Sequence, residues 1–300
     1  MTSKGPLLLL KETAAGWEKH DAARLAAALS YYTLLSLAPV LVIAVTIVGL
    51  AFGEDAARGH LASEIGAVVG PQAARSIEAV IANARAPSRG ILSSAIGVIV
   101  LLLGASGVFG ELQSSLNTIW SVEPKPGRGI SGVIRDRFFS FTMVLGVAFL
   151  LLVSLIVSAA LSAVGHVFSS SLPGGDVLWQ VLNVAFSIVI ITLLFALIFK
   201  VVPDIDIQWR DVWLGAFVTA LLFSAGKFLL ALYLGRAGMT SSYGAAGSLV
   251  ALAAWVYYAA QILFLGAEFT QVHANQRGSR VKPSENAVSV DAPDSNVVRQ

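Results

Sequence analysis

Four polar residues lie within or at the ends of long apolar stretches, and their side chains are the ones best placed to carry chemistry. They are Glu111, Lys227, Gln261 and Glu268. Charged groups are costly in hydrocarbon, so those that face neighbouring helices commonly mark the path of a substrate or an ion. The four residues therefore favour a polar path between helices. The alternative is that Lys227 reaches the membrane interface while the two carboxylates pair with basic residues outside the apolar stretches.

Helical spacing defines the faces on which these residues lie. At about 100° per residue, Lys227 shares a face with small residues, and Gln261 and Glu268 share a face one heptad apart. The small residues are Ala216, Ala220, Ser224 and Ala231 beside Lys227, and Ala254 beside Gln261. Lys227 and Glu111 are expected at different depths, which argues against a direct salt bridge between them. The basic residues expected to pair with the acids are Arg24, Arg135, Arg137 and Lys200.

Neither a catalytic centre nor a metal site is expected. The histidines fall in different connecting or terminal segments, and none has a second histidine or a carboxylate at ligand spacing on a shared helix face. They are His20, His60, His166 and His273. The chain contains no cysteine, which excludes disulfides and thiolate ligands. No phosphate-binding or nucleophile motif stands in its required context, so we expect neither an enzyme nor a bound cofactor.

The composition indicates which class of protein positions these residues. Hydrophobic residues make up 56% of the chain and charged residues 13%, with a mean hydropathy of +0.77, whereas roughly a quarter of the residues of a soluble domain are charged. The basic residues are distributed between apolar stretches and form no stripe that would bind nucleic acid. We therefore expect an all-α, polytopic membrane helix bundle with membrane lipids as its partners.

Six apolar stretches are long enough to cross a bilayer as helices. They are residues 29–52, 91–111, 138–164, 177–202, 212–234 and 245–266. Residues 1–28 predict an amphipathic helix at the membrane interface. Residues 54–90 predict short amphipathic helices outside the membrane, and residues 275–300 are expected to be a disordered tail. Pro39 is expected to kink the first span, because it removes one backbone hydrogen bond.

The second span is the one around which the bundle is expected to pack. Gly97, Gly104 and Gly107 fall along one side of this helix, and Glu111 lies on the same side. A face of small residues lets a neighbouring helix approach closely. This spacing predicts that Glu111 faces other helices and not lipid.

The distribution of lysine and arginine predicts the orientation. One set of connecting and terminal segments carries fourteen of the twenty basic residues and the other carries five, while Lys227 lies within a span. Basic residues are enriched on the cytoplasmic side of membrane proteins. Both termini are therefore expected in the cytoplasm, with residues 54–90 outside.

Three long blocks of sequence resemble the YihY/BrkB family of bacterial inner-membrane proteins. They are ALSYYTLLSLAPVLVIAVTIVGLAFG (Ala28 to Gly53), GASGVFGELQSSLNTIW (Gly104 to Trp120) and SSYGAAGSLVALAAWVYYAAQILFLGAEFTQVHA (Ser241 to Ala274). The resemblance spans roughly residues 15 to 275 and implies a six-helix protein of the plasma membrane. Members have been labelled virulence factor, ribonuclease BN and transporter of lipids or envelope components.

The residues do not support the ribonuclease label, because the sequence offers no metal cluster, general-base pair or surface for RNA. Two classes of function remain open. One is a transporter or flippase-like protein for an amphiphilic envelope component, with the four polar residues along its path. The other is a scaffold or regulator of envelope assembly that transports nothing. The substrate, the source of energy and the oligomeric state stay open.

Overall fold

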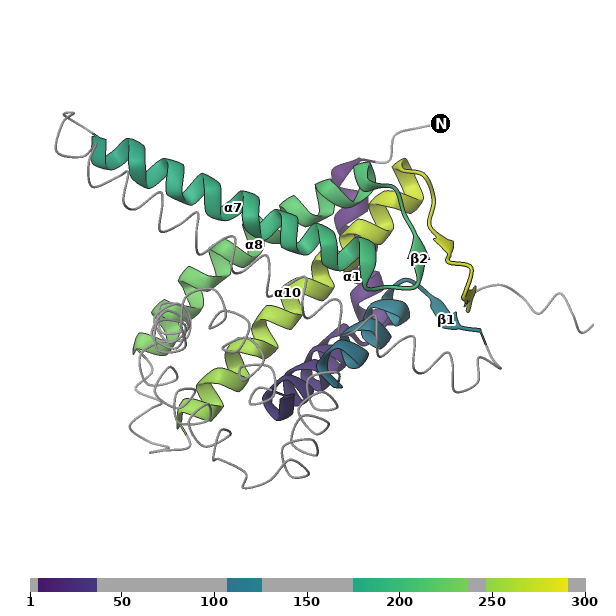
Figure 1. The fold of residues 1–300 in the computed structure, drawn as a ribbon, viewed down its shortest axis with the longest axis horizontal. Coiled ribbons are helices and arrows are strands. Elements are labelled where there is room, and N and C mark those ends of the chain that lie inside the picture. The colour runs from purple at the N-terminus through teal and green to yellow at the C-terminus, as the bar shows by residue number, and fades with distance from the viewer. Residues whose placement is uncertain (1–4, 37–106, 126–174, 237–246, 291–300) are drawn as a thin grey trace, which may run out of the picture.

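The computed structural model describes residues 5–36, 107–125, 175–236 and 247–290 (Figure 1). Several predicted features lie outside these residues. They are the Pro39 kink, Gly97, Gly104, the amphipathic segment 54–90, the span 138–164 and most of the spans 29–52 and 91–111. The side chains of residues 227–236, Lys227 included, also lie outside the description.

Three long helices form the largest part of the described fold. They are α7 (Gly175–Val201), α8 (Trp209–Arg236) and α10 (Gly247–Arg277). α8 lies between the other two and packs against both of them (Figure 1). The helices predicted at 177–202 and 212–234 are thus present, with slightly different ends. Within the described residues, Val184–Val201 of α7 and Leu252–Arg277 of α10 are long and apolar enough to cross a membrane.

α10 is longer than the apolar pattern predicted. The prediction placed its end near residue 266, but the helix continues to Arg277 and contains 31 residues, which corresponds to about 46 Å at 1.5 Å per residue. The apolar stretch does end near Gly266, but no helix-breaking residue follows until Gly278. Ala267 and Ala274 in the extension are fully buried, so packing stabilises this part of the helix.

The N-terminal segment forms two helices and not the single interfacial helix that was predicted for residues 1–28. α1 (Pro6–Lys19) begins with Pro6 in its first turn, where a missing backbone N–H costs nothing. The chain then turns at His20 and Asp21, and a second helix spans residues 22–36. Asp21 adopts a positive φ of 50°, a conformation that aspartate tolerates better than most residues. The predicted start of the first span at residue 29 therefore lies within the second helix.

A helix of residues 107–119 packs beside the 22–36 helix and completes the core. The buried apolar side chains of these two helices meet those of α7, α8 and α10 in one cluster. Its largest fully buried apolar members are Leu116, Ile119, Phe199, Val212 and Phe264. The second span's predicted amphipathic extension after Glu111 is therefore helical, and its apolar side faces the core.

Two short β ladders join segments that are far apart in the sequence. β1 (Val122–Pro124) pairs antiparallel with β4 (Ala287–Ser289), and β2 (Ile205–Asp206) pairs antiparallel with β3 (Lys282–Pro283) (Figure 1). The prediction of an all-α fold omitted these strands, and the prediction of a disordered tail was wrong for residues 278–290. The segment lacks apolar periodicity because the backbone hydrogen bonds of the two ladders hold it in place, together with isolated contacts of Val281 and Ala287 with the core.

Of the three glycines predicted to pack on the second span, Gly107 is the one whose surroundings are described. A Cβ atom at this position would lie 3.5 Å from the Ser36 hydroxyl and 3.8 Å from Cδ1 of Tyr32, which are ordinary contact distances. We therefore expect Gly107→Ala to retain the melting temperature of the parent, whereas Gly107→Leu forces the 107–119 helix away from the 22–36 helix and lowers it. Thermal unfolding in detergent measures both. Equal melting of Gly107→Leu and the parent would contradict this packing.

A buried histidine and glutamate beside an open pocket

α1 and α10 run antiparallel along one side of the molecule. Near the start of α1, Glu12 accepts a hydrogen bond from the side-chain amide of Gln276. Further along α1, Gly16 lies against Glu268, and Trp17 lies near Gln261 and Leu265. Residues closer to the C-terminus of α1 therefore contact residues closer to the N-terminus of α10, as expected for antiparallel helices. This face of α10 is the one on which Gln261 and Glu268 were expected to lie.

The central contact of this interface is a pair of ionisable side chains. Nδ1 of His20 lies 2.7 Å from Oε1 of Glu268. The Glu268 side chain is fully buried, and that of His20 is 9% exposed. A buried carboxylate requires a partner, because desolvation without one costs several kcal/mol. His20 ends α1, so the end of this helix supplies that partner.

Gly16 creates the space that the carboxylate occupies. A Cβ atom on Gly16 would collide with Oε2 of Glu268. Gly16 precedes His20 by four residues, so both lie on the face of α1 that contacts α10. The absence of a side chain at Gly16 thus lets the backbone of α1 approach the carboxylate while His20 reaches it from one turn further on.

Each member of the pair retains one polar atom without a partner. Nε2 of His20 and Oε2 of Glu268 are both buried and lack hydrogen bonds. Buried polar atoms are satisfied in the great majority of cases, so two exceptions within one pair need an explanation. The pair has unused capacity to hold a proton or a hydrogen-bonding group.

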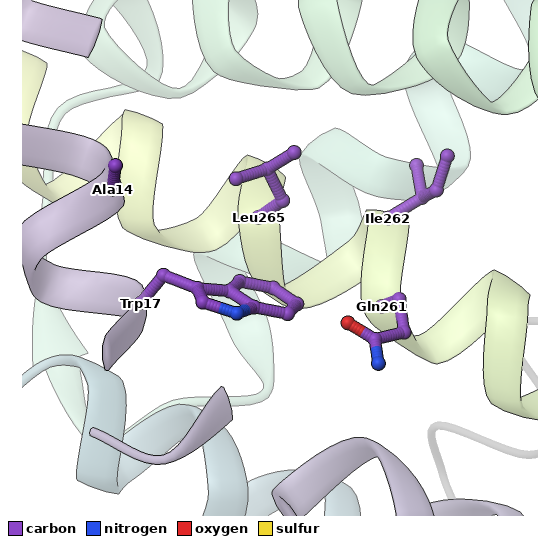
Figure 2. Close-up of a pocket in the computed structure, with 5 residues that line it drawn as sticks. All are labelled: Ala14, Trp17, Gln261, Ile262 and Leu265. Atoms are coloured by element: carbon purple, nitrogen blue, oxygen red, sulfur yellow. The ribbon is translucent and has the colours of Figure 1, made fainter. Parts of the chain in front are cut away.

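An open pocket of about 280 Å³ lies between the same two helices. It is lined by Ala14 and Trp17 of α1 and by Gln261, Ile262 and Leu265 of α10 (Figure 2). The Trp17 ring extends from α1 toward Gln261, whose amide is the main polar group on the α10 wall (Figure 2). Leu265 precedes Glu268 by one helical turn, so the pocket adjoins the buried pair. Such a lining suits a molecule with an apolar body and a polar group.

The opposite side of α10 is fixed by a reciprocal contact with α8. Gly215 of α8 faces Thr270 of α10, and Gly266 of α10 faces Thr219 of α8, each so closely that a Cβ atom on the glycine would collide with the threonine side chain. Both threonines are fully buried and donate to the carbonyl four residues earlier in their own helix. Their polar atoms are therefore satisfied without a cross-helix partner. Small residues permit this approach of two helices.

A second polar cluster fixes the segment after α10. Asp211, in the first turn of α8, accepts hydrogen bonds from the backbone N–H and the hydroxyl of Ser279 at 2.8 and 2.7 Å. Burial alone would raise the pKa of Asp211, but the two hydrogen bonds from Ser279 and the nearby Arg210 together lower it below its ordinary value of 3.8. Asp211 is therefore a carboxylate at neutral pH.

Asp204 and Asn117 form a comparable contact between the α7–α8 connection and the 107–119 helix. The backbone N–H of Asp204 donates to Oδ1 of Asn117 at 2.8 Å, and Nδ2 of Asn117 donates to the Asp204 carboxylate at 2.9 Å. This two-way contact holds the start of β1 near the start of β2. The Asp211–Ser279 cluster and the two ladders together fasten residues 278–290, which we call the C-terminal strap, to the ends of three helices.

The structure brings together two of the four predicted polar residues. Gln261 and Glu268 face α1 on one side of α10. Glu111 is half-buried and accepts a hydrogen bond from the Ser115 hydroxyl of its own helix at 3.4 Å. Within the described part of the chain, no contact joins Glu111 to Gln261 or Glu268, and the side chain of Lys227 is not described.

The predicted pairing of Glu111 and Glu268 with basic residues was wrong for Arg24 and Lys200, the two predicted partners that the structure describes. Glu268 pairs with His20. Lys200 donates to the Ile207 carbonyl, and Arg24 pairs with Asp21 at the surface. His20 was not among the expected partners because only arginine and lysine were considered for the carboxylates, and the histidines were compared only with ligands on their own helix. The spacing of Gly16 and His20 on one face of α1 was the signal available.

Across the ranges 5–36, 107–125, 175–236 and 247–290, no three histidine, aspartate or glutamate side chains lie close enough to one another to hold a metal ion.

The described part of the chain is mostly helical, and two of its helices are long and apolar enough to cross a membrane. Residues 13–291 match the family described as Virulence factor BrkB. The chain belongs to this family, which confirms the resemblance to YihY/BrkB proteins.

Curated relatives carry names that state only a membrane location. A UPF0761 membrane protein of Verminephrobacter eiseniae is 29% identical over 256 residues, covering 82% of this chain and 57% of that protein. The UPF0761 membrane protein YihY of Shigella sonnei is 32% identical over 199 residues, covering 65% of this chain and 62% of the relative. The chain thus spans less than two thirds of the length of these relatives. No solved structure matches it.

Proposed function

We propose that this protein is a transporter or flippase-like protein for a lipid or another amphiphilic envelope component. The observation that carries the proposal is the pocket between α1 and α10, which combines apolar walls with one amide and adjoins a buried ionisable pair. An acyl chain suits the apolar walls, and the Gln261 amide suits a polar group of the same molecule. Charged and polar groups on inward faces of membrane helices commonly serve transport.

We propose further that the chain crosses the bacterial inner membrane six times, with both termini in the cytoplasm. The distribution of basic residues supports this orientation. In this arrangement the C-terminal strap and the C-terminal part of α10 lie on the cytoplasmic side, and the pocket lies about four helical turns along α10 from the strap. The proposed activity requires no catalysis and no nucleic acid, and membrane lipids are the partners.

Blocking the pocket tests the transport proposal. Ala14→Trp places a bulky ring in the pocket, whereas Ala15→Trp adds the same ring at the adjacent exposed position, which does not line it. In vesicles reconstituted with fluorescent envelope lipids, we expect Ala14→Trp to reduce lipid translocation at least tenfold and Ala15→Trp to leave it within about twofold of the parent.

Two outcomes would contradict the proposal. Parent protein that translocates none of a panel of envelope lipids favours the scaffold function instead. Equal translocation by Ala14→Trp and the parent removes this pocket from the path. Melting curves of both variants establish that each is folded before its transport is compared.

A further inference from the structure

We propose that His20 and Glu268 form a binding site for one exchangeable proton, and that binding of this proton favours docking of α1 on α10. The inference rests on the proposed function, because the role assigned to the proton is to couple its binding to the opening of the pocket. Proton binding by the pair can be tested in an experiment that does not measure transport. Three observations carry the proposal: the 2.7 Å contact between the two side chains, their burial, and the unpartnered atoms Nε2 and Oε2.

Counting protons gives the net charge of the pair. When the pair holds one proton, this proton is on Nδ1 and is donated toward Oε1. With this proton alone, the imidazole is neutral and the carboxylate is ionised, so the pair carries one negative charge. A second proton, taken from water, makes the pair neutral, either as an imidazolium with a carboxylate or as an imidazole with a carboxylic acid. Release returns this proton to water.

Burial selects between these two states. A net charge in a desolvated site is costly, whereas a neutral, hydrogen-bonded pair is much less so. α1 contributes to the burial of Glu268, with Gly16 against Oε2 and His20 beside Oε1. Docked α1 therefore favours the pair with two protons. When α1 leaves α10, water reaches both side chains and the preference is lost.

The sign of the pH dependence follows from linkage. The docked state binds the second proton more tightly than the undocked state does, so docking is favoured at low pH and lost as pH rises through the titration of the docked pair. Since one proton is exchanged, the ratio of docked to undocked protein falls at most about tenfold per pH unit.

α1 is a suitable element for such a movement. It forms one wall of the pocket through Ala14 and Trp17, and α10 forms the other. The chain turns at His20 and Asp21 before the 22–36 helix begins, so α1 can change its position by rotation about these two residues alone. Loss of the proton then uncovers Gln261 and opens the pocket.

Other charged or titratable groups surround the pair on the elements packed here. They are Lys11, Glu12, Glu18 and Lys19 on α1, Asp21 and Arg24 after it, Glu111 on the 107–119 helix, and His273 and Arg277 on α10. Glu12 interacts with Gln276, and Asp21 pairs with Arg24. All these groups stay in place when Glu268 alone is neutralised, so the direction of the pH effect in that variant separates the pair from its surroundings.

The test measures the position of α1 directly in the purified full chain. Because the chain has no native cysteine, spin labels can be placed on Ala15→Cys in α1 and Ser114→Cys in the 107–119 helix, which are both exposed. Their distance distribution is recorded in detergent from about pH 5 to 8, the range in which histidine ordinarily changes charge. Gly16→Leu, which cannot dock, supplies the undocked reference.

The parent is expected to show a docked distance at low pH and a growing undocked population as pH rises. Glu268→Gln is expected to show the reverse, because the remaining His20 is neutral without its second proton and burial then disfavours protonation. His20→Gln is expected to keep the direction of the parent, since burial favours the protonated Glu268. Melting curves confirm that each variant is folded.

A parent distance that does not change with pH overturns the proposal, and so does a change in the same direction in Glu268→Gln. No lipid is present in this experiment. A negative result in this experiment therefore does not contradict the transport proposal. Likewise, an absence of lipid translocation does not contradict the proton site.

Discussion

Gly215→Ala and Gly266→Ala are each expected to destabilise the protein severely. In both variants the new methyl group would collide with a buried threonine on the facing helix. These threonines are bonded to their own helix and cannot swing away without losing that hydrogen bond. Overpacking of this kind costs about 1–3 kcal/mol and occasionally more. Thermal unfolding in detergent is expected to show a lower melting temperature for each variant.

Gly110→Ala is the matched control for these two substitutions. Gly110 also lies within a helix, but a Cβ atom there would meet nothing within 4 Å. Alanine is favoured over glycine within helices by about 1 kcal/mol, so this variant is expected to melt at or above the temperature of the parent. A general loss of stability in all three variants would show that the substitution, and not the contact, is responsible.

Removing the opposing side chain should relieve the collision and restore part of the lost stability. The double variant Gly215→Ala with Thr270→Gly returns the lost space, and it is expected to be more stable than Gly215→Ala alone. The rescue remains incomplete because glycine within α10 costs about 1 kcal/mol. Additive effects of the two substitutions would contradict the contact between positions 215 and 270, since coupled neighbours deviate from additivity.

Asp211→Ala is expected to release the C-terminal strap. The carboxylate accepts two hydrogen bonds from Ser279, and its loss leaves both donors to find other partners, at a cost of about 1–3 kcal/mol each if they stay buried. We expect a lower melting temperature and rapid proteolysis within residues 278–290. Asp206→Ala is the control, because its side chain is exposed on the neighbouring strand. Equal protease resistance in the parent and Asp211→Ala would contradict this role.

Acid is expected to reproduce the effect of Asp211→Ala. The folded-state pKa of Asp211 is lowered below 3.8, so its contribution to stability is fully present above the unfolded-state value and is lost as pH falls through the folded-state value. Protease resistance of the strap should therefore persist at neutral pH and decline only in strong acid. This direction is opposite to that proposed for α1, which allows the two titrations to be separated in one protein.

The positions of the long helices could be predicted from local sequence, and their pairing could not. The apolar stretch of α7 ends near Pro203, and a proline at this position indicates the end of a helix. In contrast, His20 and Glu268 are 248 positions apart, and the spacing on either helix does not relate one residue to the other. Their meeting depends on the antiparallel docking of α1 on α10, which is a tertiary property that periodicity does not encode.

Close helix packing was predicted from the glycines of the second span, of which Gly97 and Gly104 lie outside the described residues and Gly107 makes only ordinary contacts. The tighter contacts involve Gly215 and Gly266, each followed four residues later by a threonine. Threonine was not counted as a small interface residue, although its back-bonded hydroxyl lets it pack as one. The strap was missed for a different reason, since its strands are too short to carry an alternating pattern.

The two β ladders also impose an order on biosynthesis. Residues 122–124 and 205–206 leave the ribosome long before their partners at 287–289 and 282–283, so neither ladder can close until the segments between them have been made. Chains fold from the N-terminus during synthesis, and contacts between distant segments form late. The ladders therefore close only after α8 and α10, which lie between the paired strands in sequence, have been synthesised. A chain that stalled before residue 282 would carry both early strands unpaired, a state that a quality-control protease could distinguish from the finished protein.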